Sequence, residues 1–288
     1  MLATFSCLFG MGAYEILHFP KDARSLSLHN AASSFDHYLL RNNPAALSVT
    51  SENTIYSYLI LPASIYSVEI QRTHKIDSGI CGGKLSYISY GSIIDSETGG
   101  KTTAYDFLFE IGYKKELKNI ISVGISGGYL LNYISEYNSQ LLYINFGIRS
   151  TMIKKRIGFG LSIENVGYLI SSYTDVKESI PTIFRSSLYY RPKFLPTIIS
   201  IDIMRIIDRD DVELSGGLEF FPRKQLTLRF GLSTHRTSLL TDDFSSNFLA
   251  DISGGVGFKF NKMNIDIGFM NLAAAGYVVG FSISKKID

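Results

Sequence analysis

The sequence has few cysteines, no tryptophan and no long apolar run. Its only cysteines are Cys7 and Cys81, too few for a disulfide framework or a cysteine-based metal site. No uninterrupted apolar run reaches the roughly 18 residues that a membrane-spanning helix requires. The net charge is +2, which is too small to predict a nucleic-acid partner. These absences argue against a disulfide-stabilised domain, a helical membrane protein and a nucleic-acid-binding protein.

Apolar residues are nevertheless abundant, and they occur in short alternating stretches. Hydrophobic residues make up 45% of the 288, with 18 Tyr and 19 Phe. The stretch YDFLFEIGY, residues 105–113, has large apolar residues at its odd positions. Its even positions carry small or charged residues for the most part: Asp106, Leu108, Glu110 and Gly112. A period of two predicts a β-strand with one apolar face.

Similar alternation recurs along most of the chain and predicts fourteen strands. We expect them at 54–61, 65–76, 79–92, 103–115, 119–133, 140–151, 156–167, 181–191, 196–206, 211–221, 225–235, 248–260, 263–272 and 276–285.

This pattern favours an all-β fold, a transmembrane antiparallel β-barrel. Lipid requires an outward apolar band, and closure of the barrel satisfies every backbone group. Tyr105 and Tyr113 are eight residues apart in the sequence, roughly 26 Å along a strand and close to the ~25 Å height of an apolar band. We therefore expect both tyrosines at the membrane interfaces. The alternative is a soluble all-β protein.

The expected connections differ between the two ends of the barrel. From the second strand onward every second link is short and basic. The interleaved links include the three longest, near 92–102, 168–180 and 236–247, and they carry Asp and Glu. Short periplasmic turns and long outer loops are typical of outer-membrane barrels. We therefore expect the outer membrane of a Gram-negative-type bacterium, with outer-membrane lipid as a partner and both termini periplasmic.

Alternation also assigns charged residues to the lumen. The expected lumen-facing charges are Asp106, Glu110, Arg149, Glu164, Arg185, Asp202, Glu213, Glu219, Arg229, Asp251, Lys259 and Asp266. Because both signs occur, we expect internal ion pairs, which either hold the lumen closed or select a substrate. The repeated SGG at 126–128, 215–217 and 253–255 predicts backbone bends or close packing against a plug.

The chain divides into three segments. Residues 1–12 resemble the end of a secretory signal, although a positive n-region is missing. Residues 13–50 are too polar and irregular for a membrane strand, and we expect them to form a plug or hatch inside or beneath the barrel. Residues 51–288 form the expected barrel.

Catalytic and cofactor motifs are not evident. The five His residues show no metal-ligand spacing, and no nucleophile elbow occurs. We therefore expect no enzymatic activity, no metal and no cofactor.

The opening of the chain resembles the PorV/PorQ family of outer-membrane proteins, which itself resembles the long-chain fatty-acid transporters. The matching residues are Gly12, Ala13, Ala23, Arg24, Ala31, Ala32, Asp36, Asn43, Pro44, Ala45, Ala46 and Leu47. Later echoes are ENVG (164–167), IPTIFRSSLYYRP (180–192), SIDI (200–203) and GLEFFPRKQLTLRFGLS (217–233). The run 25–30 is less rich in Gly and Met than is usual in the family.

This resemblance implies a fourteen-stranded barrel with an N-terminal plug. For the PorV/PorQ branch it implies a role in type IX secretion, with secreted cargo proteins and secretion-machinery components as partners. Two other functions stay open: a FadL-like transporter for a hydrophobic small molecule in the lumen, and a purely structural barrel.

Overall fold

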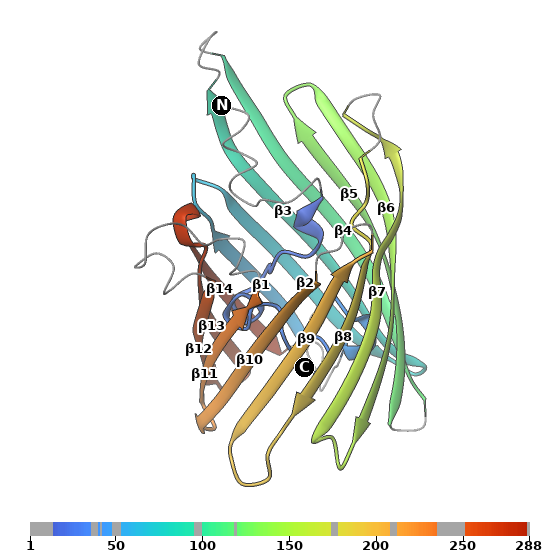
Figure 1. Ribbon diagram of the computed structural model, residues 1–288, viewed down its shortest axis with the longest axis vertical. Coiled ribbons are helices and arrows are strands. Elements are labelled where there is room, and N and C mark those ends of the chain that lie inside the picture. The colour runs from blue at the N-terminus through green and yellow to red at the C-terminus, as the bar shows by residue number, and fades with distance from the viewer. Residues whose placement is uncertain are drawn as a thin grey trace.

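The computed structural model describes residues 14–35, 40, 42–47, 53–94, 100–117, 120–173, 178–207, 212–234 and 251–286. In this part of the chain, fourteen antiparallel strands close into one barrel, and β1 pairs with β14 (Figure 1). The strands are β1 (Asn53–Ile60), β2 (Tyr66–Ile76), β3 (Gly79–Ile94), β4 (Lys101–Leu117), β5 (Ile121–Ile134), β6 (Tyr137–Met152), β7 (Ile157–Ser171), β8 (Ile183–Tyr190), β9 (Thr197–Ile206), β10 (Val212–Arg223), β11 (Leu226–Ser233), β12 (Ile252–Phe260), β13 (Met263–Asn271) and β14 (Tyr277–Lys286).

The predicted fold class is confirmed, and each predicted strand has a counterpart in the barrel. One boundary differs clearly, because β7 continues to Ser171 instead of ending near residue 167. Asn165 adopts a positive φ of 60°, and its N–H donates to the Asn145 side-chain oxygen at 2.7 Å. The β6–β7 register shifts at this bulge and the strand then resumes. The long connection that was expected from residue 168 therefore begins at residue 172.

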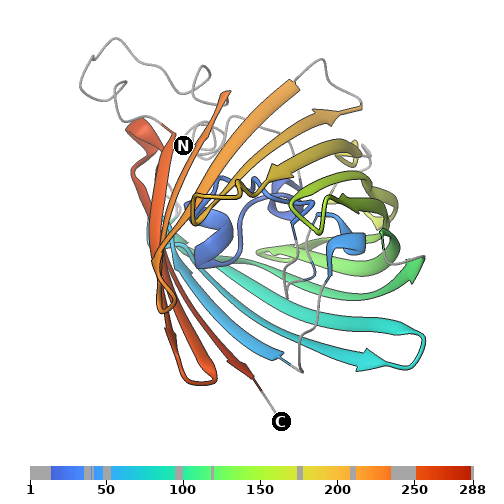
Figure 2. The same cartoon turned by 90° about the horizontal axis from the view of Figure 1, so that it is seen from below.

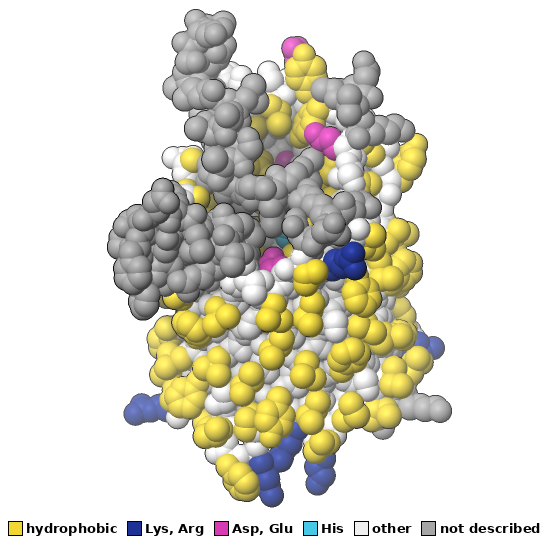
Figure 3. Space-filling view, in the orientation of Figure 1, with side chains coloured by type: hydrophobic (Ala, Val, Ile, Leu, Met, Phe, Trp, Pro, Cys, Tyr) yellow, Lys and Arg dark blue, Asp and Glu magenta, His cyan; other side chains and the backbone are white. Residues whose placement is uncertain are grey.

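The exterior of the barrel is apolar. Figure 3 shows hydrophobic side chains covering much of the visible wall. The end of the barrel that carries the long connections is here called the loop end. Near it, tyrosine rings on β1 to β5 contact one another from strand to strand, with ring centroids 4.9–6.4 Å apart. These rings belong to Tyr58, Tyr66, Tyr87, Tyr105 and Tyr133. Tyr113, at the other end of β4, donates its hydroxyl to the Ser78 carbonyl at 2.8 Å.

The barrel wall is uneven in height. Strands β3 to β7 have 14 to 17 residues, whereas the other strands have 8 to 12. The longer strands rise beyond the rest of the wall at the loop end (Figure 1). As a result, the β7–β8 ladder stops at Glu164 and Ile183, while the β6–β7 ladder continues to Gln140 and Ser171.

The described residues between 14 and 47, here called the plug, lie inside the barrel (Figure 2). They form η1 (Glu15–Leu17), α2 (Ala23–Ser27) and η2 (Pro44–Ala46), and a further short helix, η4 (Ala273–Ala275), precedes β14. The Asp22 carboxylate caps α2 by accepting from the Ser25 N–H at 3.0 Å. Asn43 caps η2 in the same way, by accepting from the Ala45 N–H at 2.9 Å. Within the described ranges, no helix is long and apolar enough to cross a membrane.

The outward position of Phe109, halfway between Tyr105 and Tyr113, generates a test of the membrane-facing surface. Phe109→Arg should lower the free energy of unfolding by about 2–4 kcal/mol, because it places a cation near the bilayer midplane. Urea unfolding from phospholipid vesicles measures this value. The control Phe109→Leu should change it by less than about 1.5 kcal/mol. An equal change in the free energy of unfolding in Phe109→Arg and Phe109→Leu would contradict the assignment of Phe109 to the membrane-facing surface.

Candidate functional site: the plug and the lumen

The plug contacts opposite sides of the wall. Its helix α2 packs against β11 to β14 and β1, whereas η2 packs against β4 to β7. The two sets of contacts make the plug a bridge across the lumen. The polar groups that hold each end come from both the plug and the strands.

Arg24 is the central ionic contact of α2 with the wall. Its guanidinium donates to both carboxylate oxygens of Glu219 on β10, at 2.5 Å (Nη2–Oε1) and 3.0 Å (Nε–Oε2). Arg229 on β11 donates to Glu219 at 2.9 Å and to Asp266 on β13 at 2.5 Å. Burial alone lowers the pKa of Arg24, but the Glu219 carboxylate raises it above its usual value. The four side chains therefore form one alternating network of charges.

The segment that follows α2 is held by two wall carboxylates. Asp202 on β9 accepts from the backbone N–H groups of Ala32 and Ser33, at 2.9 and 3.2 Å. Asp251, just before β12, lies 2.7 Å from Nε2 of His29. Burial lowers the pKa of His29, but the hydrogen bond and the negative charge of Asp251 outweigh it, so the pKa is raised overall.

The η2 end of the plug lies against glycines of the wall. Asn43 donates its side-chain N–H to the backbone carbonyls of Ile148 and Leu161, at 3.2 and 3.3 Å. A Cβ added at Gly147 would lie 3.0 Å from the Asn43 Cγ, and one at Gly124 would overlap the backbone of η2. Glycine at these wall positions gives η2 the room to dock.

Two of the three SGG repeats also face the plug. A Cβ at Gly217 would lie 3.1 Å from the Cβ of Ala31, and one at Gly255 would lie 2.8 Å from the Cβ of Ser27. The third repeat differs, because Gly128 packs against the ring of Tyr143, a wall residue. Close packing against the plug thus explains the repeats at 215–217 and 253–255, but not the repeat at 126–128.

Carboxylates on β4 and β7 are paired within the wall instead of with the plug. Glu110 accepts from the Lys84 ammonium at 2.7 Å and from the Tyr143 hydroxyl at 2.8 Å. Arg185 on β8 donates to Glu164 on β7 at 2.9 Å. Asp106 accepts from Tyr90 at 2.6 Å and from Asn132 at 2.5 Å. These contacts account for much of the mixed charge that alternation assigns to the interior.

An apolar cluster fills the part of the lumen nearest the loop end. The plug contributes Tyr14, Ile16 and Leu26, and Leu17 and Phe19 pack against the cluster. The wall contributes Leu59, Leu61, Ile65, Ile88, Leu108, Leu130, Leu141, Tyr143, Leu169, Met270, Leu272 and Val278. This cluster was not predicted from the sequence, although Leu108 stands out among Asp106, Glu110 and Gly112 on the inward face. Large apolar residues at inward positions are the sequence feature that could have revealed it.

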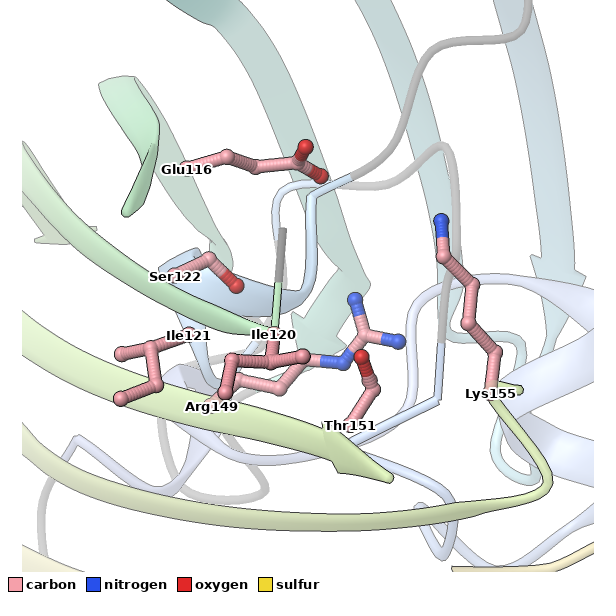
Figure 4. A pocket seen from close by; sticks show the side chains of 7 residues that line it. All are labelled: Glu116, Ile120, Ile121, Ser122, Arg149, Thr151 and Lys155. Carbon is pink, nitrogen blue, oxygen red and sulfur yellow. The ribbon is translucent and has the colours of Figure 1, made fainter. Parts of the chain in front are cut away.

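Two small cavities lie against the barrel wall, one beside the plug and one near the short turns. One, of about 30 Å³, is lined by plug residues including Phe19 and Lys21 and by Glu69 and Lys84 of the wall. Burial, reinforced by the Lys84 ammonium, lowers the pKa of Lys21 to about 8. The other, of about 10 Å³, lies near the short turns, where Arg149 extends beside Ser122 and Thr151 (Figure 4). Both are far smaller than the roughly 150 Å³ of a cavity that holds benzene.

The structure buries most of the residues that the sequence assigns to the interior. Asp106, Glu110, Arg149, Arg185, Asp202 and Glu219 are at most 5% exposed, and Arg229 and Asp266 join the Arg24 network. Lys259 differs, because it is exposed near the turn that ends β12. Among the resemblance residues, Ala23, Asn43, Pro44, Ala46 and Leu47 are buried, whereas Gly12, Ala13 and Asp36 lie outside the described residues. No group of three or more His, Cys, Asp or Glu that could hold a metal occurs in the described part of the chain.

Comparisons with known proteins agree on the fold. The toluene transporter TodX of Pseudomonas putida has a TM-score of 0.63 and 11% identity, covering 90% of this chain and 96% of that chain. The toluene transporter TbuX of Ralstonia pickettii has a TM-score of 0.63 and 9% identity, covering 96% and 100%. A FadL homologue of Pseudomonas aeruginosa has a TM-score of 0.62 and 11% identity, covering 94% and 99%.

At these identities the likeness establishes the fold alone, which is that of the FadL-like outer-membrane barrels. The sequence matches no protein-family model and no curated protein. The chain is therefore a closed fourteen-stranded barrel of the outer-membrane type. Membership of the PorV/PorQ family stays a prediction.

The Arg24 network generates a test of plug anchoring. Arg24→Met should lower the free energy of plug release by about 3 kcal/mol, because Glu219 loses one of its two buried cationic partners. Hydrogen exchange of the α2 amides should then accelerate roughly 100-fold. The control Arg205→Met, which removes an exposed exterior arginine, should leave α2 exchange unchanged. Unaltered exchange in Arg24→Met would mean that other contacts hold the plug.

Proposed function

We propose that the protein takes up hydrophobic small molecules through the lumen of an outer-membrane barrel. The observation that carries this proposal is the apolar cluster at the loop end, where fifteen buried hydrophobic residues from plug and wall meet. A water-filled porin has a polar lumen instead. The transport activity named for TodX and TbuX, with which this chain shares its fold, agrees with the proposal.

The plug must rearrange for transport. The two cavities of about 30 and 10 Å³ are too small for an aromatic hydrocarbon. The two ends of the plug are also held differently. Near the loops, Tyr14 lies within apolar packing, and its hydroxyl is 2.5 Å from that of Ser139. Further along, α2 is held by the Arg24 network. We infer that an apolar substrate first displaces plug side chains from the cluster, and that passage across the lumen then requires α2 to shift.

A substitution in the apolar cluster tests the proposal. Leu130→Asn places an amide among apolar neighbours. It should reduce uptake of toluene about tenfold or more, because a buried, unpaired amide disfavours the binding of an apolar substrate and the packing around it. Uptake is measured with radiolabelled toluene in cells that express the barrel.

A matched control is Ile206→Asn, which also changes a buried apolar residue but lies in a separate cluster with Ile183 and Met204. It should retain uptake within about twofold. Heat-modifiable mobility in gels establishes that both variants form folded barrels. Full uptake in folded Leu130→Asn would contradict the proposal.

A second function, as an accessory of protein secretion, is favoured by the upper edge of β7. Residues 166–169 and 171 make ladder pairs with β6, but in the described part of the chain residues 166–171 make none with β8. Their outward side chains Val166, Tyr168 and Ile170 are exposed. An exposed strand edge accepts an extended peptide by strand addition. Under this hypothesis the peptide belongs to a secreted cargo protein.

The edge can be disabled without changing the apolar cluster. Ile170→Pro removes a backbone donor and adds a ring, so it should reduce surface attachment of cargo about tenfold or more in cells that depend on this protein. The control Ile170→Thr keeps the donor and should retain attachment. If cargo attachment in Ile170→Pro equals that of the wild type while toluene uptake is present, the secretion role is excluded and the uptake role remains.

A further inference from the structure

The short-turn end of the barrel combines exposed cations with exposed apolar residues. In the β6–β7 turn, Ile153 precedes Lys154 and Lys155, and in the β8–β9 turn Lys193 precedes Phe194 and Leu195. Ile153, Phe194 and Leu195 are 64%, 86% and 61% exposed. The Lys193 ammonium lies 5.2 Å from the centroid of the Phe194 ring. Figure 3 shows basic side chains gathered at this end of the molecule.

These groups lie next to the apolar exterior. The β8–β9 turn begins directly after Tyr190, an exterior tyrosine that is 46% exposed. Phe260, at the end of β12, is 73% exposed and stands two residues before Lys262. A turn that follows the exterior aromatic residues so closely lies at the depth of lipid headgroups.

Cations on the outer face of the wall extend the same surface. Lys115 of β4 and Lys285 of β14 occupy outward positions near the short turns and are exposed. Their long side chains can cover apolar surface and place the ammonium among headgroups. Among the described residues near this end, the exposed acids are Asp77 and Glu116. The exposed lysines outnumber them, so the surface is strongly basic.

We propose that this rim is a binding surface for anionic phospholipid in the leaflet that meets the short turns. The lysines bind the headgroup phosphates. The apolar side chains of Ile153, Phe194, Leu195 and Phe260 enter the membrane–water interface. Such a combination of apolar and basic groups distinguishes an anionic bilayer surface from a zwitterionic one. The proposal does not depend on what the barrel transports.

Native mass spectrometry of the purified barrel tests the proposal. Phosphatidylglycerol and phosphatidylcholine with identical acyl chains are added at equal concentrations, and bound lipid is counted. The wild type should bind phosphatidylglycerol at least about fivefold more tightly, and the preference should fall sharply at about 1 M salt. Equal binding of the two lipids would overturn the proposal. That result is expected if the basic rim binds an acidic protein instead of lipid.

Two variants locate the binding surface. The combined substitution Lys154→Gln, Lys155→Gln, Lys193→Gln and Lys262→Gln should reduce the preference to within about twofold. Lys101→Gln, at the loop end of β4, should keep it. Heat-modifiable mobility again establishes folding, and a variant that does not fold is replaced by single substitutions at the same positions. A preference that survives in the folded rim variant, or that disappears in Lys101→Gln, would overturn the proposal.

Discussion

A strand that crosses a lipid bilayer must satisfy its backbone hydrogen bonds on both edges, and the rest of this structure depends on that constraint. Pairing of β1 with β14 closes the sheet and removes its edges within the membrane band. Closure divides every strand into a lipid face and a lumen face. The interior then has to accommodate the charged side chains that alternation directs inward. It does so with paired charges, such as Arg185 with Glu164, and with a plug.

The plug is stabilised by the same rule that governs the wall, since Arg24, His29 and the Ala32 N–H are paired with polar groups of the wall. Glu219 and Asp202 are wall carboxylates whose partners include plug residues. The glycines at 217 and 255 let the plug backbone approach closely. Towards the loops these polar contacts give way to apolar packing around Leu130 and Leu141. The helix α2 therefore meets charged wall residues through Arg24, while its Leu26 belongs to the apolar cluster towards the loops.

Much of the barrel could be predicted from the sequence, because a period of two depends only on neighbouring residues. The inward charges followed from the same alternation, and Asp202 and Glu219 lie where it placed them. The extension of β7 was missed because the bulge at Asn165 shifts the register, which alternation alone does not reveal. The plug contacts were not predictable, since irregular backbone has no period. The apolar cluster was missed because Leu108 was grouped with the charged face on position alone.

We infer that α2 must move for a hydrophobic molecule to cross the lumen. A disulfide between Ala31→Cys, four residues after α2, and Gly217→Cys on β10 tests this requirement in a Cys7→Ser and Cys81→Ser background. The Cβ atoms at these positions would lie 3.1 Å apart, slightly closer than the ~3.5–4.5 Å of a typical disulfide. Toluene uptake is measured in oxidised cells and again after reduction. We expect the disulfide to stop uptake and its reduction to restore uptake. Equal uptake in both states, with the disulfide shown to be formed, would contradict this inference.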